Sequence, residues 1–332
     1  MAVANAGRGG SDLDLQDEEE LLLIISGMGE HLQAEKRYMI GAECKDCISD
    51  LQRYLRRDDP MSLAAHRALG SWRVLQTHLV PLLQATGDSD TKLAFNCLKV
   101  IVKLTMKPEQ LAMRIYDHLK EKKDPDPAYG ARLTELKRYH RAYKRAFIKA
   151  DAMGSVVWLL GRALSVPEDV RSDDEEMMIE LLLTLVLNLL HTTHPDETPP
   201  DPGDASNHIA DRETLRALLS AMDGEHVLET LLYVLQQVEE SPTYRNFNLN
   251  LLEISYYVLS AHTPGELFAK DEEASALTKE NIKAAEKKVE GGGGAGTSAE
   301  GAAETAEAEA VDVDVEAEAE AEAEAEAEAE VR

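Results

Sequence analysis

The sequence has few aromatic residues, few cysteines and no long apolar run. Phe, Trp and Tyr make up 5% of the 332 residues, so the core must consist mainly of Leu, Val, Ile, Ala and Met, as in stacked helices. Apolar runs such as Leu21–Ile25 are far shorter than the roughly 20 residues that span a bilayer. We therefore predict a soluble protein with no membrane partner.

Three cysteines, and no hydrophobic leader before them, fit a reducing compartment better than a secreted disulfide scaffold. Residues 1–16 have no signal-peptide core and carry early Asp residues, which argues against secretory and transit peptides. We expect this N-terminal segment to be disordered.

Basic residues are also scarce. Lys and Arg number 35 against 62 Asp and Glu, giving a formal net charge of −27. Residues 291–332 account for 14 of these acidic side chains and contain only Arg332 as a base. The remaining chain is moderately acidic, so any phosphate-binding surface requires a local excess of Lys and Arg.

Between residue 17 and about residue 262, apolar residues recur at helical spacing, and the breaks fall at Pro, Gly and Asp clusters. No alternating run of β-branched residues lies between these segments, so we predict an all-α fold without a substantial sheet. The predicted helices are 17–35, 43–57, 61–85, 89–107, 109–122, 131–150, 152–165, 173–191, 211–221, 224–239 and 243–262.

About eleven helices with short connections suggest stacked pairs of the armadillo or HEAT kind. No tight sequence repeat is visible, and a globular helical bundle fits the same pattern. Helical periodicity alone therefore leaves both architectures open.

Composition divides the chain into a helical domain, residues 17–270, and a tail. Residues 192–210 are dense in Pro, Asp and Thr and predict a flexible insertion. Residues 271–290 are expected to form a charged helix. Residues 291–332, Gly-rich and then alternating Glu and Ala, have nothing to bury and predict a disordered acidic tail.

Two groups of residues resemble metal sites. Cys44 and Cys47 form a single CxxC, but zinc needs about four ligands, and their spacing on a predicted helix favours a place in the core. His191 and His194, followed by Asp196 and Glu197, fit a helix end and polar loop better than a rigid metal site.

The acidic groups Asp17–Glu20, Asp58-Asp59 and Asp173–Glu176 suit helix ends rather than a catalytic pair. No nucleotide-binding, hydrolase or metalloprotease motif occurs. We therefore predict no enzyme, no cofactor, no metal and no small-molecule substrate.

The segment 131–149 is strongly basic inside this acidic domain, with Glu135 as its one acid. At about 100° per residue, Leu136, Tyr139, Tyr143 and Phe147 gather on one side. The cations gather on the other side, and they are our candidates for phosphate contacts: Lys137, Arg138, Arg141, Lys144, Arg145 and Lys149. A thinner stripe of Lys92, Lys99 and Lys103 is a weaker candidate. The alternative for both is an exposed helix face made basic for solubility.

Several segments, in order, resemble the amino-terminal domain of the Timeless family of replication-fork proteins. They are CISDLQRYLRRDD (47–59), RVLQTHLVPLL (73–83), KVIVKLTMKP (99–108), YHRAYKRAF (139–147), LVLNLLH (185–191) and NLNLLEIS (248–255). Together the matches cover about residues 20–270. The usual Arg-Phe-Gly-Gly segment and later helices of that family are absent from this sequence.

The resemblance implies an armadillo or HEAT-like α-solenoid in the nucleus. It also implies a Tipin-type partner, contacts with replicative helicase subunits and parental duplex DNA, and roles in fork pausing and checkpoint signalling. It transfers no individual DNA-contact residue. The alternative is a protein-only helical-repeat scaffold whose basic helix docks an acidic partner.

Overall fold

The computed structural model describes residues 14–32, 37–87, 89–107, 110–111, 127–191 and 205–262. The chain divides into two units at residue 267, and every described element belongs to the first. The predicted fifth helix, residues 109–122, lies largely outside the described residues, as do the tail and the charged segment 271–290. No described helix is long and apolar enough to cross a membrane.

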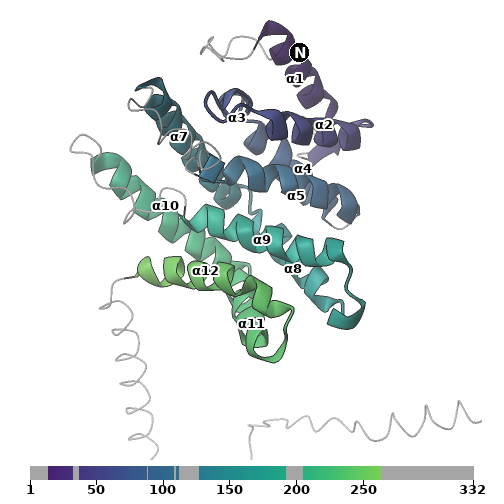
Figure 1. Cartoon of the computed structure of the whole chain (residues 1–332), viewed down its shortest axis with the longest axis vertical. Coiled ribbons are helices and arrows are strands. Elements are labelled where there is room, and N and C mark those ends of the chain that lie inside the picture. The colour runs from purple at the N-terminus through teal and green to yellow at the C-terminus, as the bar shows by residue number, and fades with distance from the viewer. Residues whose placement is uncertain are drawn as a thin grey trace, which may run out of the picture. The chain divides into compact units, whose positions relative to one another are not determined.

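The described residues are almost entirely helical, which confirms the all-α prediction (Figure 1). One short antiparallel hairpin, β1 Gly29–Leu32 with β2 Arg37–Ile40, follows the first helix. The helices are α1 Leu15–Gly27, α2 Cys44–Arg57, α3 Ala64–Ser71, η1 Leu75–Leu79, α4 Val80–Thr86, α5 Thr91–Thr105, α7 Pro127–Lys149, α8 Met153–Ser165, η2 Glu168–Val170, α9 Asp173–His191, α10 Ala205–Gly224, α11 Val227–Glu240, η3 Tyr244–Phe247 and α12 Asn248–Ser260.

Many of the described helices pack in rows. One row runs α1, α2, α5, α9, α12, each helix contacting the next. A second row runs α3, α7, α10, and α8 packs against α11. Helices α5 and α9, for example, lie side by side although they are far apart in the sequence (Figure 1). Stacked helices of this kind occur in helical-repeat proteins, in which each unit buries its apolar face against its neighbours.

The predicted helix 17–35 was wrong at its end, because α1 stops at Gly27 and the hairpin begins at Gly29. Gly29 has φ 140°, a conformation that favours glycine, and a Cβ there would lie 2.3 Å from the Met39 carbonyl oxygen. Tyr38 of β2 is hydrogen-bonded through its hydroxyl to Nδ1 of His78 at 3.1 Å. This contact holds the hairpin against η1.

The single helix predicted for residues 61–85 was also wrong, since the chain forms α3, the π-helical turn η1 and α4. Pro81 has no N–H to give to the preceding turn, so the α-helical ladder is interrupted there and the turn widens. Arg73, between α3 and η1, has φ 59°. An L-residue with a side chain costs roughly 1–2 kcal/mol in this conformation.

The insertion predicted for residues 192–210 is shorter than expected, because α10 begins at Ala205; residues 192–204 lie outside the described residues. The core consists mainly of Leu, Val, Ile, Ala and Met, as predicted from the low aromatic content. In α12, by contrast, one face of Leu249, Leu252, Tyr256 and Leu259 is exposed.

Candidate nucleic-acid interface

Helix α7 is the basic segment singled out by the sequence, and its apolar side is buried as predicted. Leu136, Tyr139, Tyr143 and Phe147 have at most 8% of their surface exposed. A Cβ on Gly70 of α3 would lie 2.3 Å from the Tyr139 ring, so α3 and α7 are in close contact at this glycine. The other neighbour of α7 in this row is α10.

The six candidate cations of α7 do not form the single exposed face that the sequence suggests. Lys144 is 1% exposed, which corrects its assignment as a surface phosphate contact. Arg141 is turned toward α10, where its guanidinium pairs with the buried Asp211. The physical reason is that α10 packs on the flank of α7 that carries these two residues.

Burial lowers the pKa of Lys144 to about 8; the nearby carboxylate of Asp211 opposes this shift, and the positive charge of Arg141 adds to it. Arg141 donates from Nε and Nη2 to both carboxylate oxygens of Asp211 at 2.9–3.0 Å. This bidentate geometry is the strong form of such a pair. Arg141 and Asp211 therefore tie α7 to α10.

Three other cations of α7 remain exposed: Arg138, Arg145 and Lys149. They are seven and eleven residues apart along the helix, so they share one side of it. The Arg138 guanidinium lies 5.2 Å from the Tyr139 ring centroid. Lys137 is half-buried.

Arg145 and Lys149 line a groove of about 360 Å³ together with Arg73, a residue that sequence reasoning missed. Its described lining is Arg73, Gln76, Ala142, Arg145, Ala146, Lys149 and Ala150, and this part of the chain contributes no carboxylate to it. Arg73, Arg145 and Lys149 are all exposed, and none is ion-paired with another described residue. The groove therefore presents three available positive charges.

Ala142 and Ala146 of α7 and Gln76 of η1 also line this groove. The groove therefore lies where α7 contacts η1. Backbone strain of this kind is found at functional positions. The φ of Arg73 is therefore a signal for this site, but it can be seen only in the structure.

The weaker candidates lie on α5, in the central row. Lys92 is exposed, whereas Lys99 and Lys103 are half-buried. The Lys99 ammonium sits 3.8 Å from the Phe95 ring centroid, and this cation–π contact gives it a structural role. Because α2 and α9 pack on either side of α5, its exposed face is narrow.

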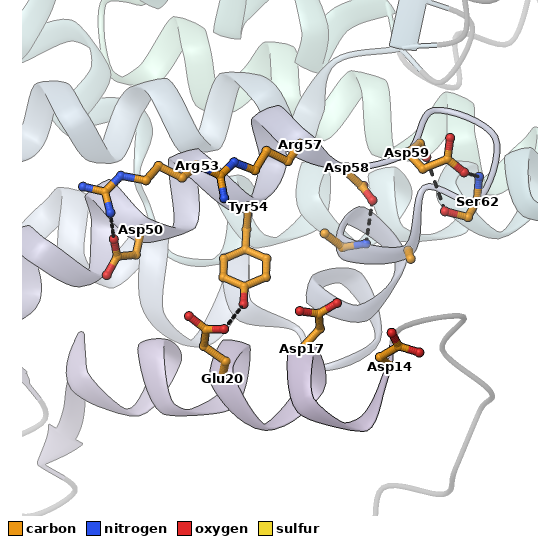
Figure 2. Close-up of a pocket in the computed structure, with 12 residues that line it drawn as sticks. Asp14, Asp17, Glu20, Asp50, Arg53, Tyr54, Arg57, Asp58, Asp59 and Ser62 are labelled. Carbon is orange, nitrogen blue, oxygen red and sulfur yellow. Dashed lines mark hydrogen bonds and ion pairs between the residues drawn. The ribbon is translucent and has the colours of Figure 1, made fainter.

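Another hollow has the opposite character. It measures about 650 Å³ and lies between α1, α2 and the loop before α3 (Figure 2). Acidic residues dominate its lining, and several already accept hydrogen bonds; Tyr54 donates to Glu20 and Arg53 donates to Asp50, both at 2.5 Å. An acidic hollow repels phosphate, so it is not the nucleic-acid surface.

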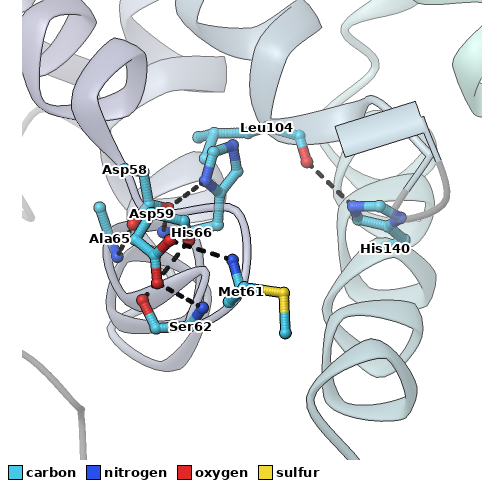
Figure 3. A network of polar contacts seen from close by, with 8 residues as sticks. All are labelled: Asp58, Asp59, Met61, Ser62, Ala65, His66, Leu104 and His140. Carbon is cyan, nitrogen blue, oxygen red and sulfur yellow. Dashed lines mark hydrogen bonds and ion pairs between the residues drawn. The ribbon is translucent and has the colours of Figure 1, made fainter. Parts of the chain in front are cut away.

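Asp58, at the rim of this hollow, acts as a helix cap. Its carboxylate accepts the backbone N–H groups of Ala65 and His66 at 3.0 Å and pairs with the His66 ring at 2.5 Å (Figure 3). The same view shows His140 of α7 bonded to the Leu104 carbonyl oxygen at 3.0 Å. The Asp58 carboxylate therefore serves a helix end, which is the role that the sequence indicates.

Cys44 and Cys47 face the core, as predicted, with 1% and 8% of their surface exposed. Burial, with the negative field of Cys47 and Asp90, raises the pKa of the Cys44 thiol to about 11. Both thiols are held protonated at neutral pH, because burial also raises the pKa of Cys47. His191 is buried against the Tyr257 ring, with ring centroids 4.9 Å apart; His194, Asp196 and Glu197 lie outside the described residues.

Among the described residues, no group of three or more His, Cys, Asp or Glu side chains is placed to hold a metal ion. The family model of the Timeless protein matches residues 37–291, which is well over half of the chain. The chain belongs to the Timeless family. The match includes the whole of α7 and the groove beside it.

Known members are similar at low identity. A human protein timeless homolog is 27% identical over 249 residues, covering 75% of this chain and 19% of the relative. The mating-type switching protein swi1 of Schizosaccharomyces pombe is 22% identical over 276 residues, covering 80% and 25%. A topoisomerase 1-associated factor 1 of Coccidioides immitis is 22% identical over 259 residues, covering 74% and 20%. This chain spans about a fifth to a quarter of their length.

Proposed function

We propose that this chain is a non-enzymatic scaffold of replication-fork protection in the nucleus, and that the groove of Arg73, Arg145 and Lys149 contacts the phosphates of parental duplex DNA. The observation that carries the DNA contact is three exposed, available cations around one groove in an acidic domain. Arg and Lys in this setting bind phosphate without reading sequence. Membership of the Timeless family supports the fork role.

Contacts with replicative helicase subunits and with a Tipin-type partner belong to the same proposal. Helical repeats offer long surfaces for such contacts, and the exposed apolar face of α12 is one such surface. Support for the fork and checkpoint roles comes from family membership alone.

The test is duplex DNA binding by the full chain, measured by fluorescence anisotropy across a salt series. Log affinity should fall with log salt by about 0.9 per phosphate neutralised. In the variant Arg145→Glu with Lys149→Glu, binding should weaken and the slope should fall by about 2. Arg245→Glu is the matched control, because Arg245 is exposed on η3, which packs against α11 and α12.

Equal affinities of the groove variant and the control for duplex DNA at low salt would remove the groove from the proposal. The second candidate is a protein-only scaffold without direct DNA binding. The exposed Leu249, Leu252, Tyr256 and Leu259 favour it, because clustered apolar residues at a surface mark protein contacts. If neither the full chain nor residues 1–270 bind duplex DNA at low salt, this alternative is favoured.

A further inference from the structure

Helix α12 is the last described member of the row α1, α2, α5, α9, α12, and it is apolar on two sides. Its inner side, with Leu251, Ile254 and Tyr257, is buried, and α9 packs against this helix (Figure 1). The other side carries four large apolar side chains that are 58–65% exposed. We call them the α12 stripe: Leu249, Leu252, Tyr256 and Leu259. An earlier member of the row, α5, packs against one helix on each side, so the stripe lies where a further helix would pack.

The α12 stripe has the spacing of a coiled-coil contact. Its members are three, four and three residues apart along the chain, which is the alternation of positions a and d in a heptad. A stripe limited to these positions is narrow and packs against one partner helix. We therefore expect its occupant to be a helix that presents a matching apolar stripe.

The order of these spacings is the same in both directions along α12. When two copies of α12 lie antiparallel about a two-fold axis at the level of residue 254, Leu249 of one copy lies opposite Leu259 of the other. Leu252 then lies opposite Tyr256. A two-fold contact makes each pairing twice, because residue i meets residue j and j meets i. All four side chains of one stripe thus find apolar partners on a second copy of the same stripe.

Charge within α12 also favours this register. Glu253 is the one charged residue between positions 248 and 260. In the antiparallel register it lies opposite Ser255 of the second copy, whereas a parallel register would place the two Glu253 side chains at the same level, where like charges repel. The flanks of the stripe offer no run of one sign that would select an acidic or a basic partner. A second copy of this chain is therefore the occupant that the stripe fits.

We propose that two copies of this chain associate through the α12 stripe, as an antiparallel helix pair about a two-fold axis. Helix α12 has 13 residues, and a pair of helices about 20 Å long buries less than the roughly 1,200 Å² of a standard stable interface. The dimer is therefore weak, with a dissociation constant of ~10–100 μM. It is independent of the proposed DNA contact, since α12 does not line the groove of Arg73, Arg145 and Lys149.

Sedimentation of the full chain without DNA, between about 1 μM and about 500 μM, brackets this constant. The mass should rise from one chain to two. Leu252→Glu should weaken the dimer at least about tenfold, because the pairing would then bury a carboxylate against Tyr256. Leu23→Glu is the matched control, since Leu23 is 72% exposed on α1, at the opposite end of the row. The mass of a single chain throughout the range, or equal weakening by the two variants, would overturn the proposal.

A salt series separates an apolar contact from an ionic one. Each chain carries a formal net charge of −27, so two copies repel each other, and salt screens this repulsion. The dimer should therefore persist or tighten as salt rises. A dimer that dissociates at high salt would be held by ion pairs, and that result would overturn the contact through the apolar stripe.

The variants Leu249→Cys and Leu259→Cys test the register. Diamide oxidises two adjacent thiols to a disulfide and is itself reduced. It should join the two variants to each other when they are mixed, because positions 249 and 259 lie opposite in the antiparallel pair, and it should join each variant to itself far less. The three native cysteines are buried, and the unsubstituted chain measures their background. Equal or preferential joining of Leu249→Cys chains to one another would overturn the antiparallel pair.

Discussion

The guanidinium of Arg141 and the carboxylate of Asp211 form a bidentate pair between α7 and α10, with three donor–acceptor distances of 2.9–3.0 Å. The Asp211 side chain is 5% exposed and that of Arg141 is 19% exposed. Removing one partner of a buried pair leaves the other charge without compensation. Removal of Asp211 would also take away the carboxylate that favours the charged form of Lys144.

We expect Asp211→Ala to lower the free energy of unfolding by about 3–5 kcal/mol, measured by urea denaturation. Arg141→Met combined with Asp211→Leu should recover much of this loss, because an apolar pair leaves no buried charge of its own. A loss below ~0.5 kcal/mol in the single variant would show that the pair contributes nothing to the packing of α7 against α10.

The buried Lys144 should make stability depend on pH. Its pKa in the folded state, about 8, is below the ordinary value of 10.5. Below pH 8 Lys144 is protonated in both the folded and the unfolded state, so the folded state bears the full free-energy cost of burying the charge. As the pH rises from 8 to 10.5, the folded state releases the proton first, so the unfolded state binds more protons and the free energy of unfolding rises.

The measurement is the difference in unfolding free energy between the wild type and Lys144→Met across this pH range. It should change in favour of the wild type by an amount on the order of 3 kcal/mol. Subtraction is needed because burial raises the pKa of Tyr143 and Cys97, and these groups lower stability over the same range. A flat difference would mean that burial does not lower the pKa of Lys144.

Asp58 should matter more than its neighbour Asp59, although both are loop aspartates before α3. Asp58 caps two N–H groups of α3 and holds the buried His66, whereas Asp59 is exposed and accepts from the turn residues Met61 and Ser62. We expect Asp58→Ala to cost about 2 kcal/mol of stability and Asp59→Ala less than ~1 kcal/mol. Thermal unfolding of both variants measures these losses of stability, and equal losses would contradict the capping role of Asp58.

Two glycines should respond in opposite directions to alanine. Gly70→Ala places a methyl group 2.3 Å from the Tyr139 ring, and overpacking of this kind costs about 1–3 kcal/mol. Gly161, exposed within α8, has nothing within 4 Å of such a methyl. Gly161→Ala should therefore stabilise the protein by up to ~1 kcal/mol. Denaturation curves for the two variants that shift together would contradict this packing of α3 against α7.

Local chemistry was predictable from the sequence where a single residue decides it. Asp90 caps α5 by accepting the Leu93 N–H at 3.0 Å, and Ser172 exchanges hydrogen bonds with Glu175 at the start of α9. Asp223, by contrast, is of a residue type that suits a helix start, yet α10 continues through it to Gly224, and α11 follows His226 in a left-handed conformation. Polar residues near a helix start are common, so the pattern alone does not locate the boundary.

The groove was less predictable because it depends on contacts between distant segments. Periodicity placed Arg145 and Lys149 on the outer side of α7, but it could not show that α10 covers the neighbouring flank and Lys144. Arg73 lies 72 residues before Arg145 and joins it only through the packing of η1 against α7. Positions of this kind follow from tertiary structure.

The backbone of Arg73 sets stability and binding against each other at one position. Its φ of 59° favours glycine or asparagine, whereas its place in the groove favours a cation. Selection for folding alone would replace this arginine, and selection for binding would retain it. In a library of all substitutions at position 73, the variants enriched by heat challenge and those enriched by polyanion capture should therefore be different.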